Sequence, residues 1–87
     1  MLKGKTKSGF EFNIKKETLD DMELIDLLVD VEENPLLISK VASKLLGAEQ
    51  KQSLYDHLRT KKGNVPIEKV TNAIVEIFNS NSDSKNV

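Results

Sequence analysis

Residues 34–63, NPLLISKVASKLLGAEQKQSLYDHLRTKKG, predict two helices that meet at a glycine. Asn34 is suited to cap the first helix, Pro35 to its first turn, and Gly47 to a left-handed conformation at its end. The residues between them follow the spacing of one apolar helix face, with Leu36, Leu37, Ile38, Val41, Ala42, Leu45 and Leu46. The first helix is therefore expected over residues 35–46.

The second half of this stretch predicts a helix over residues 49–62. Its inward candidates are Gln50, Leu54, Tyr55 and Leu58. Basic residues gather near its C-terminal end, where the helix dipole is negative, and Gly63 ends it. The two helices together form a helical hairpin with one apolar face.

Upstream of this hairpin, residues 2–7 and 10–15 flank the turn-forming pair Ser8-Gly9 and predict a β-hairpin. Phe10, Phe12 and Ile14 alternate with polar residues, which is the pattern of a half-buried strand. An isolated two-stranded hairpin is marginal in water, so this one must pack on the helices.

A further helix is expected over residues 18–32, with Thr18 as its cap and its end set by the Asn34-Pro35 pair. Its apolar residues cover more than half of the circumference, so the helix has two sides to bury. These residues are Met22, Leu24, Ile25, Leu27, Leu28, Val29 and Val31.

The last helix is expected over residues 66–79, where Ile67, Val70, Ala73, Ile74, Ile77 and Phe78 recur at helical spacing. Residues 80–87 are polar and predict a disordered tail. The fold class is therefore mainly α, with about four helices and a small N-terminal β-hairpin, in one domain over residues 1–79.

Composition narrows the function classes. The 87 residues include no cysteine, which excludes disulfides and thiolate metal sites. No apolar run approaches the ~20 residues needed to cross a bilayer, and the N-terminus lacks a signal-peptide core, so we expect a cytoplasmic protein without a membrane partner. The net charge is −1, but residues 1–16 carry five lysines against Glu11, whereas every charged residue in 17–33 is acidic. These regions either neutralise each other or form a docking face.

Motifs for catalysis are missing, so we expect no enzyme activity, no catalytic residues, no cofactor and no metal. The single histidine, His57, is interpreted as a helix-surface residue within reach of Ser53 or Lys61. The acidic run at residues 30–34 lacks the glycine and the oxygen ligands of a calcium loop. The helix, turn, helix pattern around Gly47 is typical of some DNA-binding proteins, but the start of its second helix is not basic, and we expect no nucleic-acid partner.

The segment over residues 20–78 resembles the small tail assembly chaperones of long-tailed bacteriophages and prophages of Gram-positive bacteria. The resemblance rests on the acidic, leucine-rich helix before Asn34-Pro35 and on four later patterns. These are Leu45-Leu46-Gly47 followed by Glu49-Gln50-Lys51, the run LYDHLR over residues 54–59, Gly63-x-Val65-Pro66, and Ile77-Phe78.

The resemblance implies a protein that binds the tape measure protein, keeps it soluble, and is released as tail tube subunits polymerise. Such a protein acts in the host cytoplasm and is absent from the mature virion. The resemblance also implies self-association into homo-oligomers, and a longer frameshifted form that recruits the tail tube protein.

The candidate partner-binding residues are Met22, Ile25, Leu28, Val29, Ile74, Ile77 and Phe78. Each of them is equally suited to the core. Two other classes remain open: a small phage regulator of DNA-binding or anti-repressor type, and a minor structural connector subunit of the virion. A contiguous basic surface built from the N-terminal lysines would favour the regulator.

Overall fold

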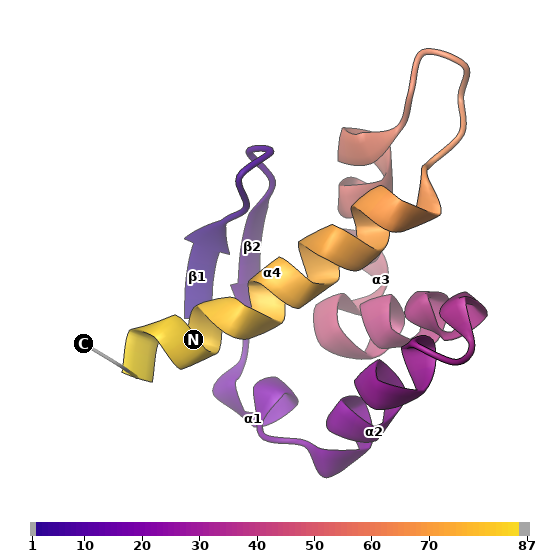
Figure 1. The fold of residues 1–87 in the computed structure, drawn as a ribbon. Helices are drawn as coiled ribbons and strands as arrows, with labels where there is room; N and C mark the ends of the chain where they lie inside the picture. Colours follow the sequence, from indigo (N-terminus) through magenta and orange to yellow (C-terminus); the bar gives the residue numbers. More distant parts are fainter. Residues whose placement is uncertain (1, 86–87) are drawn as a thin grey trace.

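The computed structural model describes residues 2–85, with the side chains of residues 2–80, and has a mainly α architecture with an N-terminal hairpin (Figure 1). The expected fold class is confirmed. In chain order the elements are β1 (Leu2–Lys5), β2 (Glu11–Ile14), α1 (Lys16–Leu19), α2 (Met22–Val31), the 3-10 helix η1 (Pro35–Leu37), α3 (Ile38–Leu58) and α4 (Ile67–Lys85).

The two strands pair in antiparallel fashion with Gly4 opposite Phe12. The Thr6 side chain closes the turn: its Oγ1 accepts a hydrogen bond from the Phe10 N–H at 3.1 Å, which satisfies a buried hydroxyl. Gly9 has a φ of +98°, a conformation that favours glycine. A Cβ atom at Gly4 would lie 2.6 Å from Cζ of Phe12, so the absence of a side chain there makes room for the aromatic ring.

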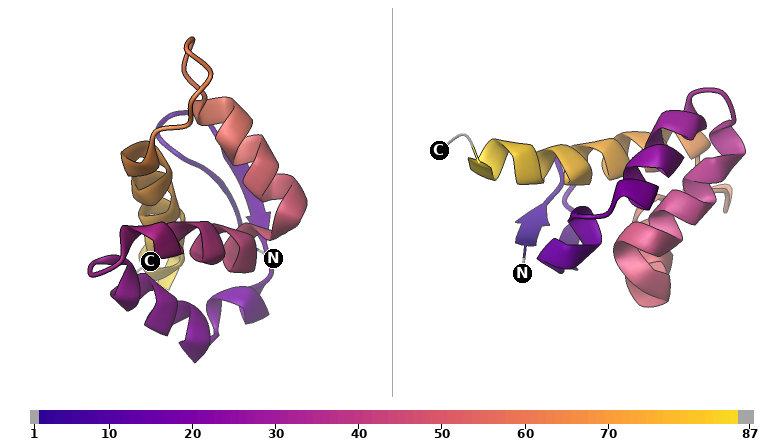
Figure 2. Two further views of the ribbon diagram at one scale, coloured as in Figure 1. Left: turned by 90° about the vertical axis from the view of Figure 1, so that its right-hand side faces the viewer. Right: turned by 90° about the horizontal axis from the view of Figure 1, so that it is seen from below.

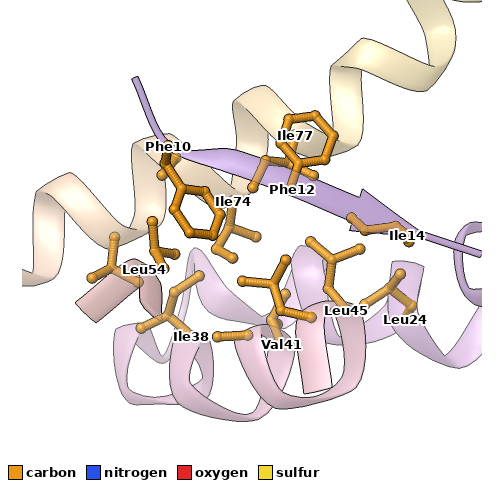
Figure 3. Packing of buried hydrophobic residues seen from close by; sticks show 14 of the residues in the cluster. Phe10, Phe12, Ile14, Leu24, Ile38, Val41, Leu45, Leu54, Ile74 and Ile77 are labelled. Carbon is orange, nitrogen blue, oxygen red and sulfur yellow. The ribbon is translucent and has the colours of Figure 1, made fainter. Parts of the chain in front are cut away.

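The core lies between the hairpin and the helices. The side chains of Phe12 and Ile14 on β2, and of Phe10 just before it, point toward α4 and α3 and form one buried cluster with the helices (Figure 3). The helical members labelled in Figure 3 are Leu24 from α2, Ile38, Val41, Leu45 and Leu54 from α3, and Ile74 and Ile77 from α4. This packing supplies the support that the hairpin needs.

Gly47 divides α3 into two straight parts, which run in different directions (Figure 2). Its φ of 77° is positive as expected, but its ψ of 169° is extended and not left-handed helical. The break turns the second part of α3 toward the hairpin. There the Gln50 side chain accepts a hydrogen bond from the Asn13 N–H at 2.8 Å and donates one to the Asn13 carbonyl at 2.9 Å, so it occupies the outer edge of β2.

Replacing Gly47 by valine is expected to destabilise the protein by about 1–3 kcal/mol, because this region of φ and ψ is nearly restricted to glycine. No atom lies within 4 Å of the added Cβ, so the cost comes from the backbone and not from a clash. Chemical denaturation of both proteins measures it. The matched control is Ala48→Val, which places a valine at the next, exposed position and should cost no more than about 0.7 kcal/mol. Equal losses for the two variants would contradict the conformational argument.

Three helix boundaries differ from the sequence-based expectation. The helix expected over residues 18–32 is interrupted at Asp20 and Asp21, and Asp21, not Thr18, caps α2 by accepting a hydrogen bond from the Glu23 N–H at 3.0 Å. The helix expected to reach residue 62 ends at Leu58, because Thr60 and Asn64 close a separate loop through their backbones and side chains. That loop projects from one end of the molecule (Figures 1 and 2).

The last helix continues to Lys85, where a disordered tail was expected from residue 80. Residues 67–85 contain no glycine or proline that would end the helix. Residues 86 and 87 of the expected tail lie outside the described part of the chain.

Candidate functional site

The outward side of α2 carries a row of exposed apolar side chains. Met22, Ile25 and Val29 are 65%, 37% and 63% exposed, and their spacing places them along one face of the helix. The opposite side packs into the molecule through buried Leu24 and through half-buried Leu27, Leu28 and Val31. The expectation that this helix has two apolar sides is therefore met, with one side covered and the other open. We call Met22, Ile25 and Val29 the α2 row.

Acidic side chains border the α2 row. Asp26 lies four residues after Met22 and three before Val29, so helix geometry makes it a neighbour of both, and its side chain is exposed. Asp21, the cap of α2, forms an ion pair with Lys44 on α3, with 3.2 Å between Asp21 Oδ2 and Lys44 Nζ. The N-terminal lysines form no ion pair with α2 within the described part of the chain, so the acidic face is not neutralised by them directly.

Hydrogen bonding to Lys44 lowers the pKa of the Asp21 carboxyl below its ordinary value, and the Glu23 N–H acts in the same direction. Lys44→Gln is therefore expected to raise the pKa of Asp21, measured by carboxyl NMR titration. Because the folded-state pKa is lowered, the associated stabilisation is present above the unfolded-state pKa and is lost as the pH falls through the folded-state pKa. Lys40→Gln, which removes the same charge one turn away, should leave the Asp21 titration unchanged; a similar response to both variants would rule out the specific pair.

The other candidate partner-binding residues lie elsewhere. Ile74 and Ile77 are fully buried in the core, so neither side chain is exposed to a partner. They face inward because β2 and α3 cover that side of α4. Leu28 and Phe78 are half-buried and pack against the core, which leaves each of them only a partial contact surface.

Two further apolar residues are exposed that the sequence placed on apolar helix faces but did not suggest as partner contacts. Leu36 on η1 and Ile67 at the start of α4 are exposed, and with Pro35, Tyr55 and Val65 they line a groove of about 250 Å³. The half-buried Tyr55 ring packs against the core and also forms a wall of this groove, and the Lys51 ammonium lies 5.7 Å from the ring centroid. The exposure of Leu36 follows from the 3-10 turn, whose geometry differs from that of an α-helix.

His57 contacts the hairpin and not its own helix. Its Nε2 atom lies 3.0 Å from the Ser8 carbonyl, and its ring lies 6.0 Å from the Phe10 ring, measured between centroids. The alternatives suggested by the sequence, Ser53 and Lys61, are not its partners here. His57 therefore joins the end of α3 to the turn of the hairpin.

No helix within the described residues is both long and apolar enough to cross a membrane.

On the exposed face of the hairpin, Lys5 is paired across the strands with Glu11, and Lys3 with Asn13. Of the two lysines of β1, one therefore lies opposite an acidic side chain and the other opposite a neutral one.

Comparisons with protein-family models, with curated proteins and with solved structures found no match to this chain.

Proposed function

We propose that this protein is a tail assembly chaperone of a bacteriophage or prophage, and that it binds the tape measure protein through the α2 row. The observation that supports this role is the exposure of Met22, Ile25 and Val29 on a helix whose other side is firmly packed. An exposed apolar row of this kind is suited to a helical partner, because burying the apolar face of that helix against the row provides the binding affinity.

The charges around the α2 row define the partner further. Asp26 and the other acids of α2 are exposed, so a partner helix with basic residues beside its apolar face would be favoured, and an acidic one would be repelled. The tape measure protein is a long helical chain with apolar segments, and the proposal is that such a segment lies along α2. Binding keeps that chain soluble until tail tube subunits polymerise around it. The proposal involves no catalysis, cofactor or metal.

The proposed role includes release of the chaperone during tube assembly, and so its absence from the mature particle. The proposal also includes a longer frameshifted product that recruits the tail tube protein. It further includes self-association of this chain through its exposed apolar surface.

Co-expression with the tape measure protein from the same genome tests this function. The expected result is that the tape measure protein, insoluble alone, becomes soluble and copurifies with this chain. An insoluble tape measure protein beside a well-folded, abundant chaperone would contradict the proposal. Detection of the chain in purified particles would instead favour a structural subunit.

A further inference from the structure

A second surface, separate from the α2 row, lies at the end of the molecule where the hairpin turn, the C-terminal end of α3 and α4 meet. They enclose a cleft of about 500 Å³. Lys7 and Ser8 supply the hairpin wall, residues 57–60 the α3 side, and Lys69, Asn72, Ala73 and Glu76 the α4 side.

The cleft is rich in positive charge although the whole chain has a net charge of −1. Lys7, Arg59 and Lys69 line it, against the single carboxylate of Glu76. Arg59 is engaged, since it donates hydrogen bonds to Asp56 at 3.0 Å and to the Gly63 carbonyl at 2.9 Å. The ammonium groups of Lys7 and Lys69 have no ion pair or hydrogen bond within the described side chains. These two charges are therefore available to an anionic ligand.

The walls of the cleft are held in place by contacts between distant parts of the chain. The Lys7 N–H donates a hydrogen bond to Glu76 Oε2 at 2.6 Å, which fastens the hairpin to α4. His57 Nε2 lies 3.0 Å from the Ser8 carbonyl, which fastens the hairpin to α3. A site whose walls are fixed before binding loses less conformational entropy when a ligand arrives.

The lining also indicates the kind of anion. Half-buried Leu58 contributes apolar surface to the lining, together with the edge of buried Ala73, which suits a peptide better than a bare inorganic ion. The Glu76 carboxylate accepts its hydrogen bond from the Lys7 backbone N–H, so it leaves the Lys7 ammonium group to a ligand.

We propose that this cleft binds an acidic peptide segment of a partner protein, with its carboxylates at Lys7 and Lys69 and its chain against Leu58 and Ala73. This site is independent of the α2 row, so it gives the protein a second partner surface of opposite charge.

The test measures binding of a fluorescein-labelled hexaglutamate peptide at low ionic strength by fluorescence anisotropy, using the full chain. The double variant Lys7→Gln/Lys69→Gln is expected to bind at least about tenfold more weakly than the wild type. The matched control, Lys15→Gln/Lys16→Gln, removes two exposed charges at the start of α1 and should change the affinity by less than about threefold. Thermal unfolding of each variant confirms that the fold is kept.

Amide chemical shifts provide a second measurement, and hexaglutamate should perturb Lys7, Ser8, Lys69 and Asn72 while leaving α2 unchanged. The proposal is overturned if hexaglutamate does not bind, or if the control variant loses as much affinity as the cleft variant. Tighter binding of inorganic phosphate or of single-stranded DNA would overturn the assignment to an acidic peptide. Because none of these outcomes involves the α2 row, they leave the proposed chaperone function to its own test.

Discussion

Ile77→Ala is expected to destabilise the protein by about 2–5 kcal/mol, because Ile77 is fully buried in the core beside Phe12 (Figure 3) and its truncation leaves a cavity. A domain of this size has a total stability of roughly 5–15 kcal/mol, so the variant loses a large part of it. Chemical denaturation gives the change directly. The melting temperature should fall by at least about 8 °C, since each kcal/mol is worth about 4–8 °C in a small domain.

The control for Ile77 is Val75→Ala, two residues away on the same helix. Val75 is 44% exposed, so its truncation should change the stability by no more than about 0.5 kcal/mol. A stable Ile77→Ala protein that unfolds like the wild type would place Ile77 at the surface and contradict the packing described here.

The sequence predicted the fold well where the deciding signals are local. Asn34 caps η1 by accepting a hydrogen bond from the Leu36 N–H at 3.3 Å, and Gly47 breaks α3, both as expected. The alternation of Phe10, Phe12 and Ile14 places all three in the core. In these cases a residue type strongly favours one conformation or environment, so the local sequence is sufficient to predict the structure.

Helix boundaries were less predictable because several residues compete for the same role. Thr18 and Asp21 are both good caps, and the structure uses Asp21, whose carboxylate also pairs with Lys44 from a distant part of the chain. The end of α3 depends on the loop between Thr60 and Asn64, which no helix propensity describes. These choices depend on contacts that exist only in the folded chain.

The candidate site could be predicted only in part. The apolar residues of α2 and α4 have similar patterns in the sequence, so both helices contributed candidates. The structure separates them because the hairpin covers the apolar side of α4, whereas α2 packs mainly on α3 and η1 and keeps Met22 and Val29 exposed. The basic cleft was not anticipated, since Lys7 and Lys69 are far apart in the chain and come together only when the hairpin turn meets α4.

Replacing Val29 is expected to weaken binding of the tape measure protein by at least about tenfold while the melting temperature stays nearly unchanged. Burial of a valine side chain contributes about 1.5 kcal/mol or more, and a charged replacement at an apolar contact adds a desolvation cost. Two variants are informative: Val29→Asp and Val29→Lys carry opposite charges, so an apolar contact predicts losses in both. A purely electrostatic contact predicts opposite effects.

The most direct measurement is therefore the affinity of the purified tape measure protein, kept soluble as a fragment, for wild type, Val29→Asp, Val29→Lys and the matched pair Val75→Asp and Val75→Lys. Val75 is also an exposed valine, on α4 instead of α2. The account predicts that both Val29 variants lose binding, that both Val75 variants keep it, and that all four melt near the wild-type temperature. Full binding by the Val29 variants, or losses confined to the Val75 variants, would contradict the assignment of the α2 row as the partner surface.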